Sequence, residues 1–170
     1  MTRDLNVYVL MLKQDDPHKC TAAKLSKFGF ARVLFRIRQI PRESIVLNPM
    51  ASRVILHDDR NRVNDYGLVA IDCSWEKAQA EFRRGFPGLQ RRLPTLLAGN
   101  PTNYAKRHKL SSVEALAAGM FILGSKDTAV KLLSLFKWGN TFLTLNNELL
   151  EAYSKANSEA DLTEIESQFF

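Results

Sequence analysis

The apolar residues of the first hundred positions fall into short runs that end at Gly, Pro, Asn or Asp. Residues 6–12, 67–71 and 93–98 are such runs, and their length is that of β-strands. Residues 31–40 mix apolar and basic positions, which predicts a strand that carries on one face Arg32, Leu34, Arg36 and Arg38. Short helices are expected over residues 21–27 and 75–84, the second capped by Ser74.

From Ser111 onward the apolar positions repeat every three to four residues, which is the period of an amphipathic helix. Ser111 and Glu114 have the spacing of an N-terminal capping box, so a helix should begin there. A second helix is expected over residues 127–137, ended by Gly139, and a third over residues 142–153. Because strands come early and helices late, we predict an α/β protein with helical packing at its C-terminal end.

The composition is that of an ordinary globular protein, with 45% hydrophobic and 25% charged residues in 170. No apolar run approaches the roughly 18 residues of a membrane span, and the first residues lack the apolar stretch of a secretory signal. Cys20 and Cys73 make no disulfide framework, and together with His18 they make a poor zinc ligand set. We therefore expect a cytoplasmic protein with no metal and no membrane partner.

The charge is uneven along the chain. The formal net charge is +6, but the last 14 residues carry four acidic side chains and no Lys or Arg, so the rest of the chain is more basic still. The basic residues cluster in three groups: the arginines between 32 and 42, those between 83 and 92, and residues 106–109. Such clusters attract a phosphate backbone, although a solvated basic surface has the same composition. We take as candidate RNA-binding residues Arg32, Arg36 and Arg38.

Two segments place polar groups directly after a predicted strand. Asp72, Cys73, Ser74 and Trp75 follow one strand, and residues 99–104, with two asparagines and a tyrosine, follow another. Ligand sites in α/β proteins lie beyond the carboxyl ends of strands. The same residues can equally serve as helix caps, a core anchor and a rigid turn. Neither a G-x-G-x-x-G nor a G-x-x-x-x-G-K-[ST] motif occurs, which argues against a Rossmann methyltransferase and an NTPase.

Five segments together resemble one family: residues 15–21, 72–75, 98–104, 109–118 and 136–139. In order and spacing they are similar to the small-subunit ribosomal RNA aminocarboxypropyltransferases of archaea and eukaryotes, over nearly the whole chain. The resemblance implies an N-terminal α/β RNA-associated part, residues 1–66, and a SPOUT-like domain with a trefoil knot, residues 67–170, that binds S-adenosylmethionine. It also implies a substrate, a pseudouridine of small-subunit rRNA, often N1-methylated, and a role in ribosome biogenesis with no obligatory protein partner evident.

Matched residue by residue, the family's cofactor contacts fall on Thr21, Ile71, Leu93, His108 and Ser112, and Ala115 is a further wall of the pocket. Asp72 and Trp75 match positions near the transferred side chain. The chain departs from the family pattern at His108, usually an aromatic, and at Ala105 and Arg107, usually Gly and Pro. These changes bear on the stacking role of position 108.

A sulfonium makes three neighbouring carbons electrophilic, and the carbon presented to the nucleophile decides which group is transferred. The resemblance therefore predicts that Asp72 takes the ammonium of the donor and that the Trp75 indole N–H donates a hydrogen bond. Asp72 is also the one candidate base for the proton of the uracil nitrogen. Two alternatives stay open: a SPOUT-type RNA methyltransferase, and an rRNA-binding assembly factor without catalytic activity.

Overall fold

A parallel β-sheet organises the computed structural model, which describes residues 6–12, 21–73 and 75–170. Its five strands have the order β2-β1-β4-β3-β5, and every pairing is parallel. Their bounds are Val7–Met11 for β1, Arg32–Leu34 for β2, Ile45–Leu47 for β3, Leu68–Asp72 for β4 and Leu89–Arg91 for β5. The central strands β1 and β4 are mostly buried, which explains why they read as continuous apolar runs.

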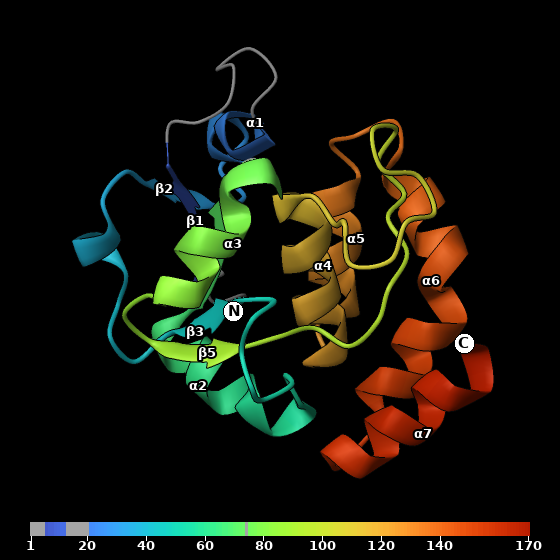
Figure 1. Ribbon diagram of the computed structural model, residues 1–170. Helices are drawn as coiled ribbons and strands as arrows, with labels where there is room; N and C mark the ends of the chain where they lie inside the picture. Colours follow the sequence, from blue (N-terminus) through green and yellow to red (C-terminus); the bar gives the residue numbers. More distant parts are fainter. Residues whose placement is uncertain (1–5, 13–20, 74) are drawn as a thin grey trace.

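Helices pack on both faces of the sheet (Figure 1). The helices within the described residues are α1 (Thr21–Lys27), α2 (Arg60–Tyr66), α3 (Trp75–Arg84), α4 (Ser112–Ile122), α5 (Lys126–Leu133), α6 (Gly139–Ser154) and α7 (Glu159–Phe169), with 3₁₀ turns at Ile37–Gln39 and His57–Asp59. Phe82 of α3 packs on one face with Leu10 and Val69, and the other face packs against α4.

The α4 helix lies at the centre of the molecule. All of its residues except Ala115 are buried, because α1, α5, α6 and β4 surround it. Gly119 permits this packing, since a Cβ at that position would come within 2.9 Å of the Leu68 side chain. The sequence predicted α4 and its capping box correctly, but its apolar stripe understated how much of the helix is buried.

The prediction of an α/β protein is confirmed, whereas that of a SPOUT-like C-terminal domain with a trefoil knot is wrong. Residues 67–170 contribute β4 and β5 to a sheet whose other strands come from residues 1–66. β4 pairs with β1 on one side and with β3 on the other, so the sheet is continuous across residue 67. The division of RNA binding and cofactor binding between residues 1–66 and 67–170 stays a prediction.

Two of the expected strands differ from the structure. Within residues 31–40, β2 ends at Leu34, because the Gln39 side chain accepts hydrogen bonds from the backbone N–H groups of Phe35 and Arg36 and a 3₁₀ turn follows. Arg32, Arg36 and Arg38 therefore do not share one strand face, although all three are exposed. Residues 93–98 form no strand either, as described below.

Two further differences concern short elements. Ile45–Leu47 forms the buried strand β3, which is only three residues long and was not anticipated. Gly139 begins α6 rather than ending the helix before it. No helix in the described part of the chain is long and apolar enough to cross a membrane.

Candidate functional site

A cavity of about 660 Å³ lies at the carboxyl ends of β3, β4 and β5. Leu47, Asp72 and Arg92 mark the three strand ends in its wall, and the N-terminal residues of α1 and α4 complete it. The segment between β5 and α4 forms the remaining side; in Figure 1 it runs across to α6 and back. Strand ends and two helix N-termini thus converge on one space large enough for a cofactor-sized ligand.

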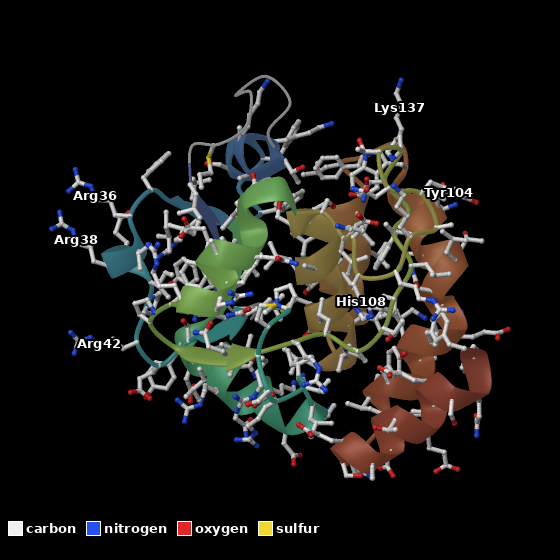
Figure 2. The ribbon with its side chains drawn as sticks, in the orientation of Figure 1. Arg36, Arg38, Arg42, Tyr104, His108 and Lys137 are labelled. Carbon is white, nitrogen blue, oxygen red and sulfur yellow. The ribbon has the colours of Figure 1, made fainter. Side chains whose placement is uncertain are left out.

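Seven residues that the sequence singled out line this cavity, although they are scattered over more than 90 positions: Thr21, Ile71, Asp72, Leu93, His108, Ser112 and Ala115. The side chain of Trp75 lies outside the described residues, and so does Ser74. Arg32, Arg36 and Arg38 are not among the described residues that line the cavity. Figure 2 shows Arg36 and Arg38 projecting outward at the left of the view, with His108 near its centre.

The N-terminus of α4 presents a buried hydroxyl to the cavity. Ser111 caps the helix: its Oγ accepts from Glu114 N at 3.3 Å, and Glu114 Oε1 accepts from Ser111 N at 2.9 Å. The next residue, Ser112, lines the cavity, and its Oγ is buried without a hydrogen-bond partner among the described residues. Buried hydroxyls are rarely left unpaired, and the first N–H groups of a helix attract acceptors. This corner of the cavity therefore fits the polar part of a ligand.

The buried carboxylate of Glu114 shapes the loop that follows residue 98. Besides its part in the cap, it accepts from Gly99 N at 2.7 Å and from Asn100 Nδ2 at 2.6 Å. Asn100 Oδ1 in turn accepts from Asn103 N at 3.1 Å. Asn100 and Asn103 both line the cavity. Residues 99–104 can therefore form a rigid turn and also line a ligand site, so the two interpretations of this segment are compatible.

Residues 95–97 are held by side chains on one side, while on the other side Leu97 forms an isolated antiparallel bridge with Arg107. Thr95 N donates to Glu166 Oε1 at 3.0 Å, and the hydroxyl of Tyr153 donates to Thr95 O at 2.8 Å. The Asn146 side chain accepts a hydrogen bond from Leu97 N and donates one to Leu97 O. Because side chains of α6 and α7 take these backbone groups, residues 93–98 form no ladder and the predicted strand is wrong. The pKa of Tyr153 is raised above its ordinary value, first by burial and then by the charge of Glu166, which keeps the hydroxyl a donor.

The rim of the cavity carries two strained backbone positions. Ala105 and His108 have positive φ angles, 63° and 59°, which is rare for residues other than glycine. His108 is further held by its N–H, which donates to Leu96 O at 3.2 Å, and its Nε2 lies 3.3 Å from Thr95 Oγ1. The left-handed conformation at Ala105 is one that glycine adopts without strain, and glycine is the residue that the family resemblance implies at this position.

Among the residues that line the cavity, Trp138 and Asn48 were not named as site residues from the sequence. Trp138 lies between α5 and α6, and Asn48 follows β3. Asn48 is buried, and its Nδ2 donates to Phe82 O at 2.9 Å and to Gln90 Oε1 at 3.0 Å. Trp138 belongs to the fifth segment of the family resemblance, which could have indicated it. Asn48 reads as a turn residue before Pro49, and nothing in its local sequence distinguishes the two roles.

The described residues contain no group of three or more His, Cys, Asp or Glu side chains that could hold a metal ion. His18 and Cys20 lie outside these residues, so the expectation of a protein without metal stays a prediction.

Comparisons with known proteins agree with this picture. Residues 45–170 match the family model described as "Ribosome biogenesis protein, C-terminal". The chain is 42% identical to a 16S rRNA aminocarboxypropyltransferase of Methanosarcina mazei, over 99% of this chain and 96% of that protein. It is 44% identical to the enzyme of the same name from Vulcanisaeta distributa, over 87% of this chain and 81% of that protein.

A solved structure has the same fold. The SAM-dependent rRNA acp-transferase Tsr3 from Vulcanisaeta distributa superimposes with a TM-score of 0.89 at 39% sequence identity, covering 98% of this chain and 89% of that one. The family resemblance expected from the sequence is confirmed.

Proposed function

Because the chain belongs to the family of 16S rRNA aminocarboxypropyltransferases, we propose that it transfers the 3-amino-3-carboxypropyl group of S-adenosylmethionine to a pseudouridine, N1-methylated or not, of small-subunit rRNA. The observation that carries the proposal at the level of residues is the convergence of six family-matched positions, together with Ala115, on one cavity of about 660 Å³. The solved relative is SAM-dependent by its name. The cavity here has both polar and apolar residues in its wall, and such a donor has groups of both kinds.

Six residues that line the cavity are proposed to hold the donor: Thr21, Ile71, Leu93, His108, Ser112 and Ala115. The buried Ser112 Oγ lacks a partner among the described residues, so a polar group of the donor would satisfy it. Leu93 and Ile71 are apolar walls. When bound, S-adenosylmethionine supplies a sulfonium with three electrophilic carbons. Apolar walls that cover the methyl and leave the methylene of the longer chain open would select the group that is transferred.

Asp72 and Trp75 are proposed to act on the transferred chain. Asp72 is half-buried at the carboxyl end of β4 and lines the cavity, so its carboxylate can take the ammonium group of the donor. The second proposed role of Asp72 is to accept the proton that the uracil nitrogen loses as it bonds to carbon. Trp75 begins α3, three positions after Asp72, and its indole N–H is the proposed hydrogen-bond donor.

Arg32, Arg36 and Arg38 are proposed to bind the rRNA backbone. All three are exposed: Arg32 begins the edge strand β2, and Arg36 and Arg38 follow its carboxyl end. The cavity lies at the carboxyl ends of β3, β4 and β5, which are parallel to β2, so RNA bound to Arg36 and Arg38 can also reach it. Residues 1–66 would then contribute mainly RNA contacts and residues 67–170 mainly donor contacts. A cytoplasmic location and a role in assembly of the small subunit complete the proposal.

Mass spectrometry of rRNA nucleosides from cells with and without the gene tests this function. The proposal predicts that one nucleoside carrying the aminocarboxypropyl group disappears from small-subunit rRNA when the gene is deleted. Loss of a single methyl group would instead identify an RNA methyltransferase. Unchanged nucleosides together with defective ribosome assembly would identify a binding factor without catalytic activity.

A further inference from the structure

We infer that Tyr104 is a stacking platform for an unpaired base of the substrate RNA, next to the nucleotide that enters the cavity. The inference rests on the proposed function and adds to it a contact to RNA bases. Tyr104 is 57% exposed, the highest exposure among the large hydrophobic side chains of the described residues. It sits between Asn103 and Ala105 on the loop whose members Asn103 and His108 line the cavity.

The backbone around Tyr104 is fixed by hydrogen bonds. Ala105 N donates to Ala98 O at 2.7 Å, and Lys106 N donates to Asn103 O at 3.0 Å. Ala98 N returns a bond to Lys106 O at 2.9 Å. The ring is therefore carried on a tight, strained turn that includes the positive φ of Ala105. Because the backbone that carries the ring is already fixed, and a tyrosine side chain has only two rotatable χ angles, stacking on it costs little conformational entropy.

The charge around the ring favours nucleic acid over a protein partner. Lys106 and Lys109 on the same loop are exposed, and so is Lys137, which precedes the cavity residue Trp138. In Figure 2 Tyr104 and Lys137 both project outward at the upper right, on the other side of His108 from Arg36 and Arg38. Aromatic rings among cations are the usual means of binding unpaired RNA, since bases stack on the ring and phosphates meet the lysines.

The arrangement gives the RNA a path. Arg36 and Arg38 lie on one side of the cavity residue His108 and Tyr104 lies on the other (Figure 2), so a strand held at both would pass the cavity. A nucleotide between the two contacts would have to leave its stack to enter the cavity, and the neighbouring base would lose a stacking partner. The ring of Tyr104 replaces that partner, which stabilises the opened strand.

Affinity for two single-stranded probes of equal charge tests the inference. One probe is oligouridylate, and the other is the same ribose-phosphate chain without bases; fluorescence anisotropy at fixed salt reports both affinities. Tyr104→Ala should weaken binding of oligouridylate about tenfold and leave the affinity for the abasic chain unchanged. Tyr104→Phe should bind both probes like the wild type. Lys106→Ala should weaken both by the same factor, because it removes a phosphate contact.

Tyr66→Ala is the matched control. Tyr66 is also an exposed tyrosine, at 45%, but it ends α2 and does not line the cavity. It should leave both affinities unchanged. The inference is overturned if Tyr104→Ala binds oligouridylate as tightly as the wild type, or if it weakens both probes equally. The first outcome would indicate that the exposed ring contacts a protein partner and not RNA. Neither probe is modified in this assay, so failure of the proposed transfer reaction would show in the nucleoside analysis and not here.

Discussion

Asn146 on α6 brackets the backbone of Leu97: its Oδ1 accepts from Leu97 N at 2.8 Å, and its Nδ2 donates to Leu97 O at 2.7 Å. A single buried amide thereby does for residue 97 what a neighbouring strand would do in a sheet. Leu96 and Leu93, on the same segment, line the cavity. The packing of the C-terminal helices and the shape of the cavity are thus linked through one side chain.

Asn146→Ala should destabilise the protein by about 1–3 kcal/mol, because it leaves the half-buried N–H and C=O of Leu97 without the amide that pairs with both. It should also lower the affinity for S-adenosylmethionine, since the pocket wall loses its support. Chemical denaturation and calorimetry measure the two effects. Asn147→Ala is the control: Asn147 is exposed on the same helix, and its replacement should change neither quantity. Equal effects of the two variants would mean that the bracket does not hold the segment.

The neighbouring serines at the start of α4 should respond in opposite ways. Ser112→Ala removes a buried hydroxyl that has no partner in the described structure, so stability should stay the same or rise, while affinity for S-adenosylmethionine should fall about tenfold. Ser111→Ala removes the cap and should destabilise the protein by about 1 kcal/mol. Thermal melting without ligand separates the effects on stability. If Ser112→Ala binds the donor like the wild type, the hydroxyl does not face the ligand.

Much of the fold could be predicted from the sequence, and the failures have a common physical cause. β1, β4 and α4 are long, buried and regular, so their own residues specify them. β3 is three residues long and carries too little pattern to detect. The strand expected at residues 93–98 failed because Asn146, Tyr153 and Glu166, distant in sequence, take its backbone hydrogen bonds. The SPOUT-like domain was inferred from the family resemblance. It is contradicted by the strand pairing, which joins strands of residues 1–66 and 67–170 in one sheet.

The candidate site divides in the same way. Thr21, Asp72 and Ser112 were named because the family motifs contain them, and the structure brings them to one cavity. Without the family resemblance, the residues around Asp72 did not show whether it binds a ligand or caps a helix. Trp138 and Asn48 reach the cavity through the packing of elements far apart in sequence, and their local patterns resemble ordinary turns.

Tyr153→Phe should change how stability depends on pH. The folded state holds the pKa of Tyr153 above its ordinary value of 10.0, so the tyrosine of the unfolded chain ionises first. The contribution of Tyr153 to the free energy of unfolding is therefore complete below about pH 10 and is lost as the pH rises further. At neutral pH the variant should lose about 1 kcal/mol with the bond to Thr95 O. Above pH 10 its stability should fall less steeply than that of the wild type. Parallel curves from denaturation at several pH values would contradict this assignment.

Ala105→Gly should stabilise the protein by about 1 kcal/mol, because glycine adopts a φ of 63° without the strain that a Cβ introduces. Affinity for S-adenosylmethionine should not change, since Ala105 is not among the described residues that line the cavity. Thermal melting and calorimetry check both expectations. A lower melting temperature would mean that the added freedom of the unfolded chain outweighs the strain relieved at this turn.

The most direct test of the transfer reaction uses S-adenosylmethionine labelled in two ways, in the methyl carbon or in the carbons of the aminocarboxypropyl chain. The purified protein is incubated with either form and small-subunit rRNA that contains the unmodified pseudouridine, and the label in the RNA is counted. We expect label from the aminocarboxypropyl chain to enter the RNA while the methyl label stays with the released thioether. We also expect Asp72→Ala to slow this transfer at saturating donor. Methyl label in the RNA, or no label from either form, would contradict it.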